Sequence, residues 1–153
     1  ALVVALDGQP RKLGELRDQW LLVSVGAAAC DADCRNNLYL QRQMREAMGR
    51  EKERLDWVWL VTDDAALPAD IAPALEQATV LRADGAMLAQ WLAPQAGHGL
   101  SEHLYVVDPQ GQWMMRFPAR MDGAGATQAR RDLERLLRAS ASWDQPGRAK
   151  EQP

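Results

Sequence analysis

Residues 20–34 read WLLVSVGAAACDADC, and this stretch decides the fold of the chain. Its first part, residues 20–25, is almost entirely apolar and has the length of a strand, which is typical of a strand buried on both faces of a sheet. A glycine ends this run. From Asp31 the pattern becomes helical, so the sequence predicts a buried strand that leads through a short loop into a helix. Both cysteines of the chain, Cys30 and Cys34, lie at this junction.

The residues after the junction predict a β-α-β unit. Between residues 31 and 54, apolar residues recur every three or four positions among charged ones, which indicates the longest helix of the chain. Residues 56–62 read DWVWLVT and favour a second strand. A helix between two consecutive strands is the usual parallel crossover, which is almost always right-handed. We therefore expect these two strands to pair in parallel.

The other predicted elements surround this unit. They are a strand at 2–6 before an Asp-Gly turn, a weak helix that follows Asp70 and runs to Gln77, a short strand at 79–81, a short helix at 86–92, an antiparallel hairpin of strands 103–107 and 112–117, and an amphipathic helix at 127–139. Strands that alternate with helices and then form a hairpin predict an α/β fold, with a mixed central sheet and helices on both faces.

Size and composition predict one globular domain. The chain has 153 residues, of which 47% are hydrophobic and 25% charged, and we expect a single domain at 1–142 followed by a flexible tail at 143–153. The net charge of -3, with basic residues scattered among acidic ones, argues against nucleic acid as a partner. No apolar run approaches the roughly 20 residues that cross a membrane. Because the chain starts at Ala1 rather than at a methionine, contact with a membrane is expected only through an anchor upstream of Ala1.

Cys30 and Cys34 are the candidate functional residues. They are four positions apart, so one helical turn brings both sulfurs to the same side. The free amides at a helix N-terminus favour a thiolate over a thiol, whereas the neighbouring carboxylates of Asp31 and Asp33 disfavour it. Two thiolates at this spacing suit thiol-disulfide chemistry. They also suit Cu(I) or Zn(II), if further ligands come from elsewhere in the chain.

Two structural alternatives stay open for this pair. One is a structural disulfide, although closing a loop of about five residues contributes only about 2 kcal/mol, against nearly 5 kcal/mol for a loop of about 100 residues. The other is a pair of free cysteines that act as small buried apolar side chains. A CxxxC spacing alone does not decide between these alternatives and a redox or metal site.

Only two imidazoles in the chain could complete a metal site, those of His98 and His103, and both come just before or at the start of the predicted hairpin. In a fold of this order, the loop that enters the hairpin lies near the N-terminus of the first helix, so either histidine could approach the sulfurs. Alternatively, each is a surface histidine or a locally hydrogen-bonded one. Met114, Met115 and Met121 are further soft donors, but methionine in or beside a hairpin more often fills the core.

The same residues resemble those of a known family. The strand, glycine and CxxxC of residues 20–34 are similar to the corresponding segment of SCO/SenC proteins, which are thioredoxin-fold factors of cytochrome c oxidase copper assembly. The Asp-Gly turn at residues 7–8 and the sequence YVVDPQG at residues 105–111 resemble the landmarks that flank this segment. The resemblance spans most of residues 1–140 and implies a thioredoxin-like fold of the peroxiredoxin/SCO type.

This resemblance also implies a function. It assigns Cys30 and Cys34 to thiol-disulfide exchange and to copper binding, with His103 or His98 as a further ligand. The implied partner is a protein thiol or disulfide, such as a cytochrome oxidase subunit or a copper chaperone. The implied location is the periplasmic face of the bacterial inner membrane. One departure concerns the copper ligand, because counting back from the hairpin turn places Leu100 where the family has its copper-binding histidine.

Two other functions are compatible with the residues. The first is a metal-independent thiol-disulfide oxidoreductase, in which Cys30 attacks and Cys34 resolves the mixed disulfide. The second is a non-catalytic thioredoxin-fold module that docks a partner through its surface. The sequence motifs of serine hydrolases, phosphate-binding loops and zinc proteases are absent.

Overall fold

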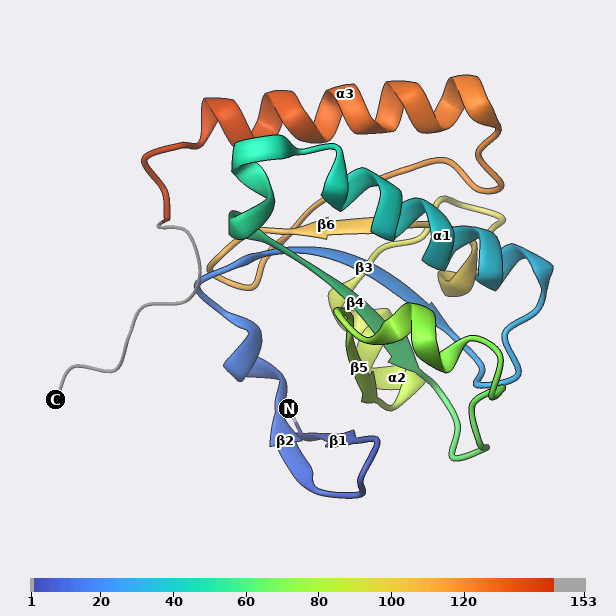
Figure 1. The fold of residues 1–153 in the computed structure, drawn as a ribbon. Helices are drawn as coiled ribbons and strands as arrows, with labels where there is room; N and C mark the ends of the chain where they lie inside the picture. Colours follow the sequence, from blue (N-terminus) through green and yellow to red (C-terminus); the bar gives the residue numbers. More distant parts are fainter. Residues whose placement is uncertain (1, 145–153) are drawn as a thin grey trace, which may run out of the picture.

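A central mixed sheet organises the molecule, whose computed structural model describes residues 2–144 (Figure 1). The described strands are β1 (Leu2–Ala5), β2 (Pro10–Lys12), β3 (Trp20–Gly26), β4 (Leu55–Val61), β5 (Thr79–Arg82), β6 (Tyr105–Val107) and β7 (Trp113–Arg116). They form one sheet in the order β2-β1-β5-β4-β3-β6-β7. β3 and β4 lie near its centre and pair in parallel, as the β-α-β pattern predicted.

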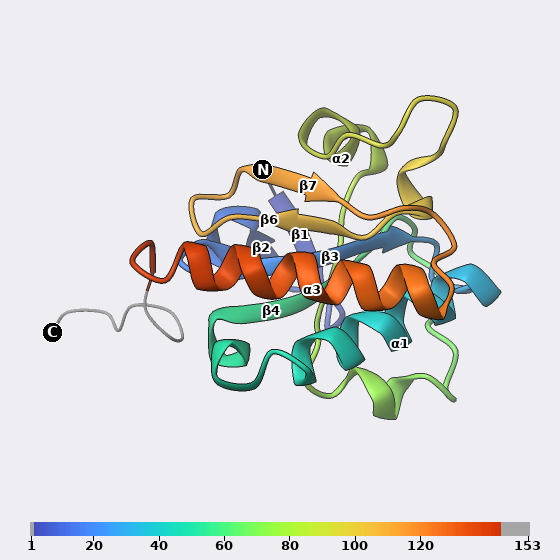
Figure 2. The same cartoon turned by 90° about the horizontal axis from the view of Figure 1, so that it is seen from above.

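Helices cover both faces of this sheet (Figure 2). The α-helices are α1 (Ala32–Glu46), α2 (Gly85–Trp91) and α3 (Gly123–Ala139), and the short 3-10 helices are η1 (Leu13–Leu16), η2 (Gly49–Arg54), η3 (Ala72–Leu75) and η4 (Leu100–Glu102). α1 and α3 pack on one face, and α2 packs on the other. The predicted α/β architecture, a mixed sheet with helices on both faces, is therefore confirmed.

The central strands divide their side chains between two cores. On the face under α1 and α3, the packed residues of β3 and β4 are Trp20, Leu22, Leu55, Trp57, Trp59 and Val61. On the face under α2, they are Leu21, Val23, Val25, Val58 and Leu60. This alternation explains why the two strands read as nearly continuous apolar runs, since both faces of each strand are covered.

A buried amide connects α1 to the two central strands. The Gln41 side chain is fully buried, and its Nε2 atom donates hydrogen bonds of 2.9 Å to the carbonyl oxygens of Leu22 in β3 and Val58 in β4. A buried amide that lost these bonds would have no water to replace them. The two hydrogen bonds therefore hold the middle of α1 at one position over the sheet.

Two helices are shorter than the sequence predicts. The helix expected over residues 31–54 is α-helical only to Glu46, and the chain soon continues as the 3-10 helix η2. Gly49, at the start of η2, has a φ of +58°, a left-handed conformation that does not continue an α-helix. The helix expected between Asp70 and Gln77 is only the 3-10 helix η3, where Pro73 supplies no amide hydrogen.

The first strand has a partner that the sequence did not predict. β1 pairs in antiparallel with β2 across the Asp-Gly turn, and on its other side it pairs with β5. Gly8 takes a φ of +86° in this turn, a conformation that glycine adopts without steric cost. Pro10 lies in β2 at an edge of the sheet, where a missing amide hydrogen is tolerated.

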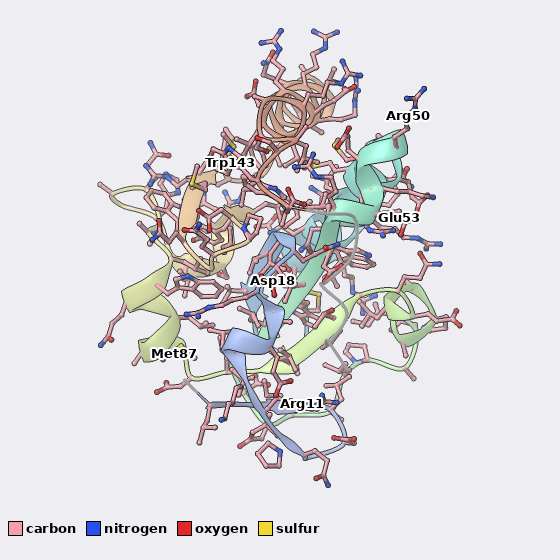
Figure 3. The ribbon with its side chains drawn as sticks, turned by 90° about the vertical axis from the view of Figure 1, so that its left-hand side faces the viewer. Arg11, Asp18, Arg50, Glu53, Met87 and Trp143 are labelled. Atoms are coloured by element: carbon pink, nitrogen blue, oxygen red, sulfur yellow. A yellow bond between two sulfur atoms is a disulfide. The ribbon has the colours of Figure 1, made fainter. Side chains whose placement is uncertain are left out.

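Contacts with the domain continue into the segment predicted as a tail. Trp143 lies beyond the end of α3 (Figure 3), and its ring stacks on that of Trp20 with centroids 5.8 Å apart. The Asp144 carboxylate accepts hydrogen bonds from Arg54 and from Trp20 Nε1. Residues 145–153, the rest of the predicted tail, lie outside the described residues.

Candidate functional site

The loop between β3 and α1 is anchored on both sides. After β3, the amide of Ala28 donates to Asp63 Oδ1 at 3.2 Å, which links the loop to the segment after β4. At the start of α1, the Asp31 side chain caps the helix by accepting a hydrogen bond of 2.9 Å from Cys34 N. Between these anchors, Cys30 has a left-handed backbone with φ of +49°. The loop therefore presents the two cysteines in a defined geometry.

Cys30 and Cys34 form a disulfide, with sulfurs 2.02 Å apart and α-carbons 5.0 Å apart. The prediction that both sulfurs lie on the same side of the helix start is confirmed. Their surroundings differ, because Cys30 is only 4% exposed and belongs to the core under α1 and α3, whereas Cys34 is partly buried. The alternative of two free buried cysteines does not apply to this structure.

A cavity of about 520 Å³ opens beside the disulfide. Its lining comes from the loop after β3, from the first turns of α1, from Ser101 and Glu102 of η4, and from Arg120. Asn37 Nδ2 donates to Ser101 O at 3.5 Å and so connects α1 to η4. The loop that enters the hairpin thus lies beside the start of the first helix, as the order of elements predicted.

Two exposed ion pairs lie near the cysteine loop, and Arg120 and Asp33 of the first pair line the cavity. Arg120 Nε lies 3.1 Å from Asp33 Oδ2, and Arg35 Nη1 lies 2.7 Å from Asp70 Oδ2. The hydrogen bond of the second pair raises the pKa of Arg35 and lowers the pKa of Asp70. Arg35 Nε also donates to Cys30 O at 3.3 Å. Arg35 therefore links the cysteine loop to the segment before η3.

Glu102 gives the wall formed by η4 a negative charge. Its carboxylate accepts a hydrogen bond from the Gly99 amide and lies 3.3 Å from His98 Nδ1, and these contacts, the Gly99 bond most, lower the pKa of Glu102. Tyr105 OH donates to Leu100 O at 2.7 Å, and burial raises the pKa of Tyr105 to about 12. The phenol therefore stays protonated and holds η4 in place.

The two histidines lie near each other but do not line the cavity beside the disulfide. Their ring centroids are 5.5 Å apart. His103 is fully buried, with Nδ1 at 2.8 Å from Phe117 O and Nε2 accepting from Gln95 N at 3.2 Å, so Nδ1 carries the proton. His98 is exposed and contacts Glu102.

In this arrangement the donors do not fit a copper centre. The two sulfurs are bonded to each other, and to bind a metal through Nε2 the buried His103 would have to give up the hydrogen bond that it accepts from Gln95 N. Met121 is buried, Met115 packs against the core and Met114 is exposed on β7, and none of them lines the cavity. Within residues 2–144, no cluster of three or more His, Cys, Asp or Glu side chains could hold a metal ion.

Tertiary contacts bring residues to the site that sequence reasoning missed. Arg120 comes from the segment between β7 and α3, where its backbone is left-handed with φ of +50°, and no local motif marks it. Asp63 lies just beyond β4, and its carboxylate holds the cysteine loop. The parallel pairing of β3 and β4 supplies a signal for Asp63, because parallel strands finish at the same edge of a sheet.

Comparison with family models gives a match over residues 20–140, to the family described as "Transmembrane-like, thioredoxin-like, C-terminal domain". The match covers all of the central β-α-β unit, the hairpin and α3. No curated protein matches the chain at a significant level.

Solved structures resemble the chain over most of its length. Copper-bound ScoI from Bradyrhizobium japonicum has a TM-score of 0.61 and 18% identity, covering 89% of this chain and 96% of that chain. A SCO1/SenC family lipoprotein from Bacillus anthracis has a TM-score of 0.61 and 16% identity, covering 90% and 92%. The thioredoxin domain of a thiol-disulfide oxidoreductase from Bacteroides vulgatus has a TM-score of 0.56 and 17% identity, covering 87% and 91%. These similarities confirm the predicted thioredoxin-like fold, and they confirm the resemblance to SCO/SenC proteins as one of fold.

Proposed function

Because the chain belongs to the transmembrane-like, thioredoxin-like, C-terminal domain family, we propose that it is a thiol-disulfide oxidoreductase domain that works through Cys30 and Cys34. The observation that carries this proposal is the disulfide itself, which lies at the junction of β3 and α1 beside an open cavity of about 520 Å³. A thiolate of a partner can reach a bond in this position, and such access is what exchange requires.

A purely structural role explains this disulfide less well. A loop of about five residues contributes only about 2 kcal/mol when it is closed. The helix that follows is already capped by Asp31 and held over the sheet by Gln41. Ala27 and Ala29 are exposed in the loop, and their small side chains leave space beside the disulfide for a peptide segment. These features suit a disulfide that is accessible to a partner thiol and is reduced in the reaction.

The proposed reaction transfers two electrons. A partner thiolate attacks one sulfur of the disulfide and forms a mixed disulfide, while the other sulfur leaves as a thiolate that takes a proton from water. A second thiol of the partner loses its proton and attacks the mixed disulfide, which releases the second cysteine as a thiolate. The partner is then oxidised to a disulfide and the domain is reduced to a dithiol. The reverse steps oxidise the domain.

A redox titration tests this function. The protein is equilibrated in mixtures of reduced and oxidised glutathione or dithiothreitol and quenched with an alkylating reagent, and mass spectrometry counts its thiols. We expect one reversible two-electron couple in the wild type and none in the double variant Cys30→Ser/Cys34→Ser. A disulfide that stays intact in the folded protein at every buffer ratio contradicts the proposal. That result would favour a structural disulfide or a non-catalytic docking module.

Copper handling stays a prediction from the resemblance, and no step of the proposed reaction uses it. Anaerobic titration of the reduced domain with Cu(I), against a competing chelator, tests this prediction in the wild type and in Cys30→Ala, Cys34→Ala, His98→Ala and His103→Ala. A histidine that binds copper gives a variant with lower affinity for Cu(I) and unchanged secondary structure. Equal affinities of the wild type and both histidine variants contradict the predicted histidine ligands.

We also propose that the domain acts in an oxidising compartment, in agreement with the periplasmic location that the resemblance implies, because disulfides persist where cytosolic reductants are absent. The similar protein from Bacillus anthracis is described as a lipoprotein. Within residues 2–144, no helix combines the length and apolar character that a membrane span needs. Labelling of the reduced cysteines in intact cells with a membrane-impermeant maleimide tests the location.

The proposed partner is a protein thiol or disulfide that enters the cavity beside Cys30 and Cys34. A cytochrome oxidase subunit and a copper chaperone stay predictions from the resemblance. A single variant, Cys30→Ser or Cys34→Ser, cannot resolve a mixed disulfide, so the variant that keeps the exchanging sulfur should retain a bound partner that the wild type releases. Mass spectrometry of the retained complex checks this expectation, and the double variant is its control.

A further inference from the structure

We propose that Cys34 is the sulfur that exchanges with the partner and that Cys30 is the resolving sulfur. This assignment rests on the proposed function and concerns the order of events within it. It reverses the order expected from the sequence, in which Cys30 attacks.

The two cysteines differ first in their exposure to solvent. Cys30 is 4% exposed, and Ala28 in the same loop is fully buried. Cys34 is only partly buried, and its chain neighbours Asp33 and Arg35 are exposed. A thiolate attacks a disulfide sulfur in line with the bond that breaks, so the attacked sulfur must offer its outer side to the nucleophile. Cys34 offers more accessible surface than Cys30.

The backbone around the sulfurs supports the same assignment. Cys34 lies in the first turn of α1, three residues after the capping residue Asp31, and helical side chains point towards the N-terminal end, which here borders the cavity. The amides of this turn favour a thiolate. Cys30 precedes the helix, and both its polar backbone atoms are bonded, the amide to Ala27 O at 3.1 Å and the carbonyl to Arg35 Nε at 3.3 Å. Its backbone is therefore held in place.

Burial also suits Cys30 to the second step. A thiol in an apolar environment ionises less readily than an exposed thiol, so the reduced domain should carry its thiolate mainly on Cys34. Once it has ionised, the buried sulfur is a strong nucleophile, because intrinsic nucleophilicity rises with the pKa of a thiol. The two α-carbons are 5.0 Å apart, so Cys30 is already positioned to attack Cys34.

In the reduced domain, the Cys34 thiolate attacks one sulfur of a partner disulfide, forms a mixed disulfide and expels a partner thiolate, which takes up a proton. Cys30 then loses its proton to water and attacks Cys34 Sγ. The bond between Cys30 and Cys34 forms, the mixed disulfide breaks, and the second partner thiolate leaves. Two electrons pass from the domain to the partner. In the opposite direction, a partner thiolate attacks Cys34 and Cys30 is the leaving sulfur.

Reaction of single-cysteine variants with small disulfides tests the assignment. Cys30→Ser keeps Cys34 and Cys34→Ser keeps Cys30, and each reduced variant is mixed with Ellman's reagent and with glutathione disulfide near neutral pH. If burial separates the two thiol pKa values by about one unit, the variant that keeps Cys34 carries about tenfold more thiolate near neutral pH. Because that thiolate is intrinsically less nucleophilic, the variant reacts about threefold faster. Equal rates, or a faster reaction of the variant that keeps Cys30, overturn the assignment.

A denaturant control shows whether the fold causes the difference. In concentrated guanidinium both variants are unfolded. If their reaction rates are equal under those conditions, the difference in rate measured in buffer comes from the folded structure. The same ratio of rates in guanidinium and in buffer overturns the assignment, because the ratio would then reflect local sequence alone.

A second measurement uses the wild type and avoids substitutions. One equivalent of reduced glutathione is added to the disulfide form, the mixture is quenched with acid, and peptide mapping locates the attached glutathione. Glutathione on Cys34 supports the assignment, and glutathione on Cys30 overturns it. A failure of the proposed function would be visible elsewhere, as a wild-type disulfide that no buffer ratio reduces, so the two failures are distinguishable.

Discussion

The two ends of the central strands carry the same kind of interaction in opposite surroundings. Where β3 and β4 begin, Arg54 and Asp144 form an ion pair whose side chains are 5% and 2% exposed. Where these strands finish, beside the disulfide, Arg35 and Asp70 form an ion pair whose side chains are 42% and 68% exposed. The buried pair belongs to the interior of the fold, where loss of one partner is costly, whereas the exposed pair lies at the surface, where an ion pair contributes little.

The buried pair is part of a larger hydrogen-bond network. Arg54 Nη2 donates to Asp144 Oδ1 at 2.6 Å, and this interaction contributes most to the raised pKa of Arg54. Arg54 Nη1 donates to Glu51 Oε2 and to Leu137 O, both at 2.5 Å. Arg54 Nη2 also donates to Ser140 O at 3.0 Å. Removal of the guanidinium would leave the Asp144 carboxylate without its cation and would take a hydrogen bond from the buried carbonyl oxygens of Leu137 and Ser140.

The largest effect on stability is therefore expected at the buried end. Arg54→Ala should lower the free energy of unfolding by about 3 kcal/mol, the lower end of the cost of breaking a buried ion pair. Urea unfolding followed by circular dichroism measures this loss, and the rate of thiol-disulfide exchange per folded molecule should not change. Arg50→Ala is a matched control on the same 3-10 helix, because Arg50 extends away from the domain (Figure 3). If Arg54→Ala and Arg50→Ala were equally stable, the buried ion pair would make no special contribution to stability.

The disulfide end should show the reverse pattern. Cys30→Ser/Cys34→Ser should abolish exchange and lower the free energy of unfolding by only about 2 kcal/mol, because the closed loop is short. The same urea experiment measures it, and the reduced wild type serves as the reference. If the double variant lost more stability than Arg54→Ala, the disulfide would be the main structural bond of the domain.

A smaller effect is expected where the chain leaves α3. Trp143→Ala removes the ring that stacks on Trp20, and an aromatic pair of this kind contributes about 1 kcal/mol. Thermal unfolding measures the change, and Trp143→Phe should restore most of it because a ring is retained. An unchanged melting temperature of Trp143→Ala would show that the stacked ring adds nothing to the stability of the buried end.

The smallest effect is expected in acid, at the exposed end. The Gly99 amide and His98 lower the pKa of Glu102, so its folded value lies below the unfolded one. The carboxylate therefore stabilises the fold above the unfolded pKa, and this contribution is lost as the pH falls through the folded pKa. Glu102→Gln should show a shallower fall of melting temperature than the wild type below about pH 4.5, near the ordinary value for Glu. Parallel melting curves of the two proteins in this range would contradict the expectation.

Local patterns predicted the parts of the molecule that depend on neighbouring residues. The β-α-β unit follows from apolar periodicity, the hairpin from a turn between two apolar runs, and the proximity of Cys30 and Cys34 from one turn of helix. The prediction of helix over residues 31–54 was too long, because Gly49 takes a left-handed conformation that periodicity does not reveal.

Features that depend on distant contacts were not accessible from the sequence. Nothing in the sequence around His103 indicates that both of its ring nitrogens form hydrogen bonds with backbone atoms in the interior. Arg120 reaches the cavity from beyond β7, and Asp144 reaches Arg54 across 90 residues of sequence. These contacts arise only once the sheet and helices are assembled, so tertiary packing, rather than local propensity, determined the surroundings of the site.

The position of Gln41 limits how a change of redox state can spread. Its amide joins α1 to two adjacent strands about two turns after Cys34, so the helix cannot slide or rotate over the sheet when the bond between the sulfurs is cut. We therefore expect structural change on reduction to be confined to the few residues between β3 and the first turn of α1. A protein that distinguishes the oxidised from the reduced domain should therefore bind that short segment itself, because no conformational change is expected on the opposite side of the molecule.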